Sequence, residues 1–280
     1  FLLGMPVAFT MALVGTIGFM VIKGPEAGLG ILARDFWDTW SSYSLTVIPM
    51  FVFMGSVAYY AGMSGRLYDG AYTIFGRLRG GLALATIVAT AGFSAICGST
   101  SATAAAMGKV AIPEMRRHGY DPGLSAGMLA AAGSLGILIP PSTIFIVYGI
   151  LTEQSIGKLF IAGVVPGLIL AFLFCMTVYV WTLFKPASAP AGGTTTMRQK
   201  LMGLTGLLEM VFLFALVLGG MFAGLFSPTQ AAGVGTAAAI LIGVLRRSLN
   251  LKKFWLAIKD TLLITAMVMT IVAGATVFGH

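Results

Sequence analysis

The chain has 280 residues, of which 58% are hydrophobic and only 9% are charged. So little charge excludes a soluble fold of this size and predicts an all-α polytopic membrane protein. The net charge of +8 does not indicate nucleic-acid binding, because the basic residues lie in short loops between apolar runs, where they set membrane topology.

Residues 1–79 are predicted to contain two crossing helices and two polar helices that lie along the membrane surface. The apolar runs Phe1–Ile22 and Val47–Met63 are the crossings. The segment Lys23–Thr46 is too polar to cross, and its aromatic residues suit a helix anchored at headgroup level; an aromatic binding surface is the alternative. Arg66–Arg79 combines apolar and charged residues at helical spacing, which predicts an amphipathic helix on the cytoplasmic face.

The stretch Gly80–Arg117 is predicted to form a helical hairpin that enters and leaves the membrane from the same side. Two apolar arms, Gly81–Cys97 and Ala102–Arg116, are each short of the roughly 20 residues that a crossing needs. Two arginines lie at each end of the stretch, and cytoplasmic flanks carry the Lys/Arg excess. The alternative is one long tilted helix whose hydroxyls bond to their own backbone.

The tip of this predicted hairpin is a candidate cation site. A backbone turn inside the hydrocarbon leaves N–H and C=O groups unpaired unless protein or a water-filled cavity covers it. Exposed carbonyls and hydroxyls at such a turn suit a hard, weakly hydrated cation. The candidate ligands are the small hydroxylated residues clustered at the turn, Ser99, Thr100, Ser101 and Thr103.

The next apolar run, Leu124–Leu151, is predicted to be a broken crossing helix. Pro140 and Pro141 at its centre each remove a backbone donor and clash with the preceding turn. We expect two half-helices joined by an unwound link over about residues 133–142; a kinked helix without a ligand is the alternative. Two breaks at membrane depth in neighbouring segments point to an ion or substrate site.

Beyond this segment, residues 152–185 are predicted to cross the membrane after a short outer loop. The Pro/Gly/Thr-rich stretch 186–203 is a cytoplasmic linker and the clearest internal boundary. Leu204–Leu225 then crosses outward and carries Glu209 near its inner end. A carboxylate in a membrane segment is a functional candidate, but the nearby basic linker favours an interfacial ion pair for Glu209.

The last part of the chain is predicted to hold two more crossings. Ser227, followed by a proline, is a helix start. Ala231–Leu245 crosses inward, Leu249–Lys259 forms a second basic surface helix, and Thr261–Phe278 crosses outward. With these assignments 13 of the 17 Lys and Arg residues lie in cytoplasmic stretches, three lie outside, and Lys109 lies in the hairpin arm. Treating the hairpin as a crossing would put most of these charges outside, so the skew supports it.

Four motifs in this order carry a family resemblance: IPMFVFMG, GFSAICGSTSATAAAMG, GSLGILIPPSTIFIVYG and GLFSPTQAAGVG. Together they resemble the large membrane subunit of tripartite ATP-independent periplasmic (TRAP) transporters. The resemblance implies sodium-coupled uptake of organic acids, such as C4-dicarboxylates or sialic acids, in the bacterial inner membrane. It also implies two partners, a small membrane subunit and a periplasmic solute-binding protein, with sodium as coupling ion and no other cofactor.

The fold implied is an inverted-repeat elevator like that of the ion-transporter superfamily. Residues 1–79 would be scaffold-type and surface helices, 80–151 the transport-domain hairpin and broken helix, and 204–280 the start of a second repeat. The resemblance assigns sodium binding to Gly98, Ser99, Thr100, Ser101, Thr103, Gly133, Ser134, Gly136, Pro140 and Pro141. It assigns substrate binding to Ser99, Thr100, Ser101 and Ser142. The family has a second hairpin that this sequence lacks, so we expect the chain to be a piece of a longer protein.

Other classes of function fit the sequence less well. A hairpin-bearing anion carrier that works without a binding protein would lack the family motifs. A membrane-embedded enzyme needs nucleophiles or metal ligands at depth, and the pair Ser99 and Lys109 is a weak signal of that kind, since Lys109 can snorkel toward the inner surface. A purely structural subunit would not need two helix breaks. Cys97 and Cys175 lie within apolar runs, which predicts apolar packing and not a disulfide.

Overall fold

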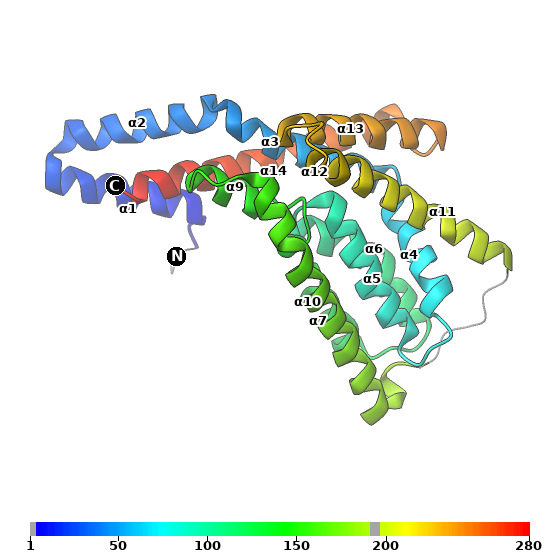
Figure 1. Ribbon diagram of the computed structural model, residues 1–280. Coiled ribbons are helices and arrows are strands. Elements are labelled where there is room, and N and C mark those ends of the chain that lie inside the picture. Colours follow the sequence, from blue (N-terminus) through cyan, green and yellow to red (C-terminus); the bar gives the residue numbers. More distant parts are fainter. Residues whose placement is uncertain (1–3, 191–196) are drawn as a thin grey trace.

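The computed structural model describes residues 4–190 and 197–280, and every regular element in these ranges is helical (Figure 1). Six helical segments are long and apolar enough to cross a membrane: Tyr43–Tyr60, Pro122–Leu151, Ile156–Phe184, Gly203–Phe222, Pro228–Leu245 and Leu251–Phe278. They coincide with six predicted crossings. The remaining one, Phe1–Ile22, corresponds to the shorter apolar helix α1 (Val7–Lys23). The chain is therefore a polytopic α-helical membrane protein.

The first and last helices of the chain lie side by side. α14 (Leu251–Phe278) packs against α1 and against α2 (Pro25–Ser41), and both chain ends lie in this part of the molecule (Figure 1). The backbones of α1 and α14 are in close contact, because a Cβ on Gly274 would clash with the carbonyl oxygen of Ala8. Three aromatic side chains are exposed in the second half of α2 and just after it: Trp37, Trp40 and Tyr43. Their predicted role as interfacial anchors requires this exposure.

Helices late in the chain also pack onto early ones. α3 (Val47–Tyr60), which follows the short turn η1 (Tyr43–Thr46), lies against α13 (Pro228–Leu245). α4 (Met63–Phe75) lies against α11 (Met197–Phe214). Residues from the two ends of the chain therefore form one helical layer.

The connection from α11 to α13 contains a wider helical turn, η3 (Ala215–Gly219), and the short helix α12 (Gly220–Phe222). The helix start predicted at Ser227 is confirmed. The Ser227 hydroxyl accepts a hydrogen bond from the N–H of Gln230 at 3.3 Å, and the Gln230 side-chain oxygen accepts one from the N–H of Ser227 at 2.9 Å. This reciprocal cap fixes the first residue of α13.

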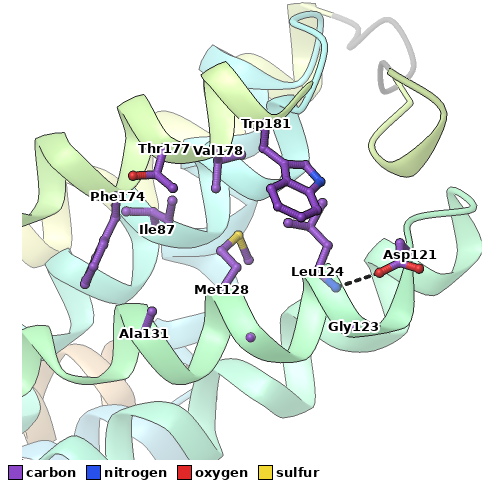
Figure 2. A pocket seen from close by; sticks show the side chains of 11 residues that line it. Ile87, Asp121, Gly123, Leu124, Met128, Ala131, Phe174, Thr177, Val178 and Trp181 are labelled. Atoms are coloured by element: carbon purple, nitrogen blue, oxygen red, sulfur yellow. Dashed lines mark hydrogen bonds between the residues drawn. The ribbon is translucent and has the colours of Figure 1, made fainter. Parts of the chain in front are cut away.

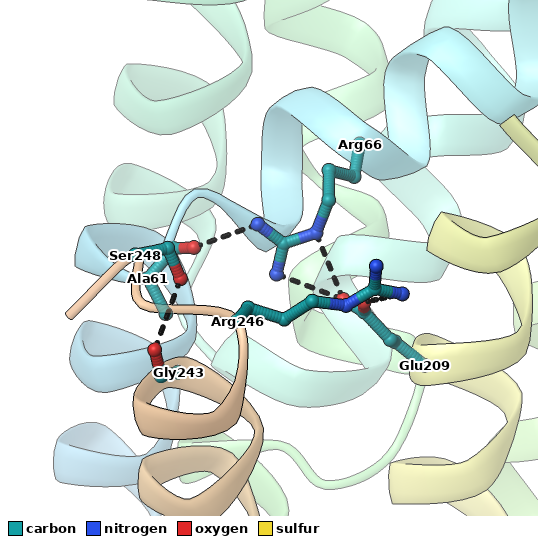
Figure 3. Close-up of polar contacts among 6 residues, drawn as sticks. All are labelled: Ala61, Arg66, Glu209, Gly243, Arg246 and Ser248. Carbon is teal, nitrogen blue, oxygen red and sulfur yellow. Dashed lines mark hydrogen bonds and ion pairs between the residues drawn. The ribbon is translucent and has the colours of Figure 1, made fainter. Parts of the chain in front are cut away.

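Glu209 on α11 joins the early and late helices through two arginines (Figure 3). Arg66 on α4 donates from Nε to one carboxylate oxygen at 2.9 Å, and Arg246, just after α13, places Nη2 2.8 Å from the other. Arg66 also donates to the carbonyl of Ala61 at 2.9 Å. Glu209 is only 8% exposed, so the guanidinium groups compensate a buried charge. An ion pair is thus confirmed for Glu209, but it is buried, and its partners are Arg66 and Arg246 and not the basic linker that suggested it.

The separate surface helix predicted at Leu249–Lys259 is wrong, because α14 runs through that segment without interruption. Asn250 caps the helix, and neither proline nor glycine interrupts its first half. The charged residue at the expected boundary, Asp260, accepts a hydrogen bond from the hydroxyl of Tyr60 on α3 at 2.6 Å. A partner in another helix therefore accommodates the charge that suggested a boundary.

α5 (Gly81–Cys97) and α6 (Thr100–Arg117) form a helical hairpin with only two residues between the arms. At its base the hydroxyl of Tyr120 accepts a hydrogen bond from the N–H of Leu82 at 3.3 Å, which joins the end of one arm to the start of the other. Burial raises the pKa of Tyr120 to about 12, so this hydroxyl is neutral at physiological pH.

Both ends of the hairpin lie beside the turn η2 (Pro186–Ser188), which follows α10 (Ile156–Phe184). The N–H of Gly80 donates to the carbonyl of Ala189 at 3.2 Å, and the N–H of Asp121 donates to that of Ser188 at 3.0 Å. The two arms therefore begin and end at the same end of the bundle. That end carries the predicted linker, of which residues 191–196 lie outside the described ranges and the last part is already helical in α11.

The broken segment consists of α7 (Pro122–Gly133), the single turn α8 (Leu135–Leu138) and α9 (Thr143–Leu151). The backbone is extended at Ile139 and at Ser142, on either side of the two prolines. The non-helical link is therefore shorter than the predicted 133–142, because one helical turn forms inside it.

Candidate functional site

The hairpin turns at Gly98 and Ser99. Gly98 has φ 63°, in the left-handed region that favours glycine, and its N–H donates to the carbonyl of Ser94 at 3.0 Å. Ser99 is extended and caps α6, where its hydroxyl accepts a hydrogen bond from the N–H of Ala102 at 3.5 Å. Two residues thus end one helix and begin the next.

The carbonyl of Gly98 connects the hairpin tip to the break. The N–H and the hydroxyl of Thr143, the first residue of α9, donate to it at 3.1 and 3.0 Å. A Cβ on Gly98 would lie 2.5 Å from the carbonyl oxygen of Pro141, so the contact requires glycine. The helical turn α8 also contacts the tip, because a Cβ on Gly136 would lie 3.1 Å from the backbone nitrogen of Thr100. The tip therefore docks into the break with backbone against backbone.

Three hydroxyls in the segments that meet at this junction are buried, those of Ser94, Thr103 and Ser142. Those of Ser94 and Ser142 have no hydrogen-bond partner among the described residues, and that of Thr103 has only the thiol of Cys97. They come from the last turn of α5, the first turn of α6 and the end of the link. A buried polar group left unsatisfied costs about 1–3 kcal/mol. Neutral oxygens in buried segments beside two helix breaks suit a hard cation, which takes oxygen ligands.

The junction lies at depth within the bundle. A Cβ on Gly163 of α10 would lie 2.6 Å from the carbonyl oxygen of Leu138, and one on Gly167 would lie 2.8 Å from the Ile139 side chain. At 1.5 Å per residue these contacts are about 11 to 17 Å from the first residue of α10. α10 has 29 residues and is about 43 Å long, so these contacts lie in its first half. A spanning α10 therefore places the break inside the hydrocarbon core, which is about 30 Å thick.

The structure brings most of the predicted site residues together. Gly98, Ser99 and Thr100 of the hairpin meet the segment that carries Gly133, Gly136, Pro141 and Ser142. Thr103 is buried one turn further along α6, beside Cys97. Three other predicted residues face elsewhere. The Ser134 hydroxyl donates to the carbonyl of Ala131 in its own helix at 2.6 Å, Pro140 lines an apolar hollow against α5 and α11, and Ser101 lines a separate cavity beside α14.

Two residues of the junction do not follow from the sequence motifs. Thr143 directly follows the link, and a hydroxyl beside a helix break is a signal that could have identified it. Ser94 carries no such signal, because a serine inside a helix ordinarily bonds to its own backbone. The pair Ser99 and Lys109 does not form a nucleophile site. Ser99 caps α6, and Lys109 lies about 15 Å further along that helix, facing Tyr59.

A groove of about 490 Å³ between α5, α7 and α10 has a different chemistry (Figure 2). Most of its lining is apolar. Asp121 at its end accepts a hydrogen bond from the N–H of Leu124 at 2.7 Å and so caps α7, while the Thr177 hydroxyl donates to Leu173 in its own helix. Its polar groups are therefore used within the helices, unlike those of the junction.

Two breaks within the membrane that dock against each other are characteristic of secondary transporters. The comparison with protein families specifies this class. The sequence matches the family described as "Tripartite ATP-independent periplasmic transporter, DctM component" over residues 1–280. The chain belongs to this family of large permease subunits, which are multi-pass proteins of the bacterial inner membrane and not enzymes.

Several characterised relatives are similar over most of this chain. The C4-dicarboxylate TRAP transporter large permease protein DctM of Pseudomonas aeruginosa is 38% identical over 89% of the chain. The ectoine/5-hydroxyectoine permease UehC of Ruegeria pomeroyi is 33% identical, and the sialic acid permease SiaM of Vibrio cholerae is 32% identical, each over 99% of the chain. The chain spans 58% of the length of DctM and 64% of the length of UehC and SiaM.

Proposed function

We propose that this chain carries an ion site of a sodium-coupled importer of organic acids. The observation that carries the proposal is the junction of hairpin tip and broken helix, where the fully buried hydroxyls of Ser94 and Ser142 have no partner in the described part of the chain and that of Thr103 has only the Cys97 thiol. A polar site at membrane depth without a charged group suits a monovalent cation, because the oxygens replace its hydration shell without adding charge.

The hydroxyls of Ser94, Thr103 and Ser142 are the proposed sodium ligands, together with free carbonyls of the turn and the link. The carbonyl of Gly98 already accepts two hydrogen bonds from Thr143, so it has a structural role in holding the tip against the break. The ion would thus lie between α6 and the link. Its binding would stabilise the docked tip, which supports a coupling of ion occupancy to the position of the hairpin.

We further propose that the hairpin is re-entrant and moves with the broken helix as a transport domain. Two observations support this. Both hairpin ends lie beside residues 188–189, and the break on which the tip docks packs against the spanning helix α10 well inside its length. The pairing of α1 and α3 with α14 and α13 supports a scaffold formed from both parts of the chain, whereas α4 packs against both α11 and the hairpin arm α5.

The substrates named for the relatives, a C4-dicarboxylate, an ectoine and a sialic acid, all carry a carboxylate. We therefore propose an organic acid as the solute. Because the family is that of tripartite transporters, we propose a small membrane subunit and a periplasmic solute-binding protein as partners.

Uptake by the full-length permease, reconstituted with its small subunit and binding protein, tests the sodium site. Ser142→Ala and Thr103→Val should each raise the sodium concentration for half-maximal uptake about three- to tenfold, since each removes one ion contact. Thr177→Val, which removes a hydroxyl bonded within α10, is the matched control and should leave it unchanged. Wild-type sodium dependence in both site variants would exclude these hydroxyls as ligands.

Thiol labelling tests re-entrance of the hairpin. Single cysteines replacing Arg79 and Arg117, at the two ends of the hairpin, should both react with an impermeant reagent from the cytoplasmic side of oriented membrane vesicles. Accessibility from opposite sides would contradict the proposal, because the stretch would then be a crossing.

A further inference from the structure

A second cavity, of about 280 Å³, lies beside the hairpin between α3, α5, α6 and α14. Its walls combine apolar residues, such as Phe93 and Ile264, with polar ones. The polar lining comes from Ser56 and Tyr59 on α3, Ser101 and Lys109 on α6, and Asp260 on α14. Side chains of the hairpin and of its neighbouring helices thus face the same space.

Lys109 is the one cation among the residues that line this cavity. Its Nζ lies 5.4 Å from the centre of the Tyr59 ring, a cation–π contact that holds the ammonium in place. Asp260 accepts a hydrogen bond from the Tyr60 hydroxyl at 2.6 Å. No carboxylate in the described part of the chain lies within ion-pair distance of Lys109. Its interactions are a contact with the Tyr59 side chain and a longer-range attraction to Asp260, which lines the same cavity.

The position of Lys109 along α6 argues against a purely topological role. It lies near the middle of Thr100–Arg117, about 12 Å from either end at 1.5 Å per residue. A snorkelling lysine reaches water from a position near a helix end. An ammonium so far from both ends is expensive in a membrane protein unless a polar cavity or a ligand accepts it.

Residues of α6 that line the cavity share one face of the helix. Ser101, Ala105 and Lys109 follow at intervals of four, so the face extends about 12 Å from the hairpin tip to the ammonium. A solute bound along this face would contact Lys109 with one end and the hydroxyl of Ser101 near the ion junction with the other.

We propose that Lys109 binds the carboxylate of the transported solute in this cavity, with the hydroxyls of Ser56 and Ser101 as further donors. This assignment rests on the proposed function, since it identifies the anion-binding group of that importer. A volume of 280 Å³ is at the lower end of the roughly 300–1,000 Å³ of ligand pockets. The cavity therefore suits a small acid, such as succinate or ectoine, better than a nine-carbon sugar acid such as N-acetylneuraminate.

The test compares uptake kinetics of Lys109→Gln and Lys109→Arg in the reconstituted full-length system, with the acid that the wild type accumulates. Lys109→Gln should raise the KM for the acid about 10- to 100-fold, because a charge-assisted contact is lost. Lys109→Arg should stay within about threefold of wild type. The sodium concentration for half-maximal uptake, measured at saturating acid, should not change in either variant. Lys252→Gln, a lysine outside the cavity, is the control and should resemble wild type.

An unchanged KM in Lys109→Gln, with sodium-dependent uptake intact, would overturn the assignment and leave the proposed function standing. A wild-type protein without sodium-dependent uptake would instead overturn the proposed function. Labelling of Lys109→Cys, with Cys97 and Cys175 replaced by alanine, decides the assignment without transport. Succinate or ectoine should slow its reaction with a methanethiosulfonate reagent at least about threefold. Equal labelling rates with succinate, ectoine, N-acetylneuraminate and no acid would overturn the assignment.

Discussion

The junction of hairpin and break and the Glu209 cluster are both buried polar regions of an apolar protein, and they differ in how their polar groups are satisfied. Glu209 is contacted by Arg66 and Arg246, at 2.8 Å each, so its charge is compensated within the chain. At the junction, Ser94 and Ser142 have no hydrogen-bond partner in the described part of the chain, and Thr103 has only the Cys97 thiol.

This difference separates a structural polar group from a functional one. A carboxylate with two guanidinium partners is complete and has nothing left to bind, whereas an unsatisfied buried hydroxyl is stable only if the rest of the fold holds it there. Removing a group from the cluster should therefore lower stability. Removing a hydroxyl from the junction should alter ion binding and leave stability intact.

The largest effect is expected at the backbone contact of the junction. Gly98→Ala places a Cβ 2.5 Å from the carbonyl oxygen of Pro141 and adds a left-handed strain of about 1–2 kcal/mol. We expect the initial rate of sodium-dependent uptake to fall more than tenfold, because the tip can no longer dock. Gly127→Ala, whose Cβ would meet no atom within 4 Å, is the matched control and should keep wild-type uptake. A Gly98→Ala variant with at least half the wild-type rate would contradict the docking role.

The next largest effect is expected in the cluster. Glu209→Gln leaves two guanidinium groups without a counter-charge, and breaking a buried pair costs about 3–5 kcal/mol. The arginines are partly exposed, at 24% and 45%, which reduces the expected loss to about 2–3 kcal/mol. In detergent the melting temperature should fall by about 5–10 °C.

The control for this variant is Glu114→Gln, which breaks an exposed pair with Arg117 on the same helix. Such a pair is worth less than about 1 kcal/mol, so melting should change by only a degree or two. Equal melting temperatures for the two variants would mean that the Glu209 cluster does not stabilise the fold. The sodium dependence of uptake should be that of the wild type in both.

Much of the fold could be predicted because each break has a local cause. The two prolines and the turn at Gly98 lie where the sequence places them, and the end of α5 at Cys97 coincides with the predicted arm. The continuous α14 could not be predicted, since the basic run before Thr261 resembles a surface helix. What lets the helix continue is the hydrogen bond between Asp260 and Tyr60, 200 residues apart in sequence.

The location of the site could be predicted from the sequence, but which of its hydroxyl groups have no hydrogen-bond partner could not. Hydroxylated residues near a break are visible in the sequence, but whether a hydroxyl bonds to its own helix depends on its rotamer and on its neighbours. Ser134 and Ser142 lie on the same segment and look alike in sequence. The structure separates them, because Ser134 donates to Ala131 whereas Ser142 is buried without a partner in the described chain.

A smaller effect is expected for Ser142→Ala when the melting temperature is measured at increasing sodium concentrations. This measurement also contrasts the junction with the Glu209 cluster more directly. Sodium that binds the folded protein should stabilise it by about 2.7 kcal/mol at 100 times its Kd. The wild-type melting temperature should therefore rise. Ser142→Ala should melt at or slightly above the wild-type temperature without sodium, since an unsatisfied hydroxyl is removed. The sodium-induced rise should shrink by more than half. A lower melting temperature without sodium and an unchanged rise would show that the Ser142 hydroxyl is structural.

The smallest effect is expected at Ser134, which the family resemblance places in the sodium site together with Ser142. Its hydroxyl donates to the carbonyl of Ala131 at 2.6 Å, so it is satisfied within its own helix, as Glu209 is satisfied by its arginines. Ser134→Ala removes a hydrogen bond that an α-helix does not need, and the carbonyl keeps its second lone pair for the backbone. We expect a change of less than about 0.5 kcal/mol in stability and less than twofold in the sodium concentration for half-maximal uptake. The measurement is the same sodium titration of uptake, run beside Ser142→Ala on the same segment. A larger loss of sodium affinity in Ser134→Ala than in Ser142→Ala would mean that the Ser134 hydroxyl leaves the carbonyl of Ala131 and binds the ion. A hydroxyl with a hydrogen-bond partner in the structure would then not mark a structural group.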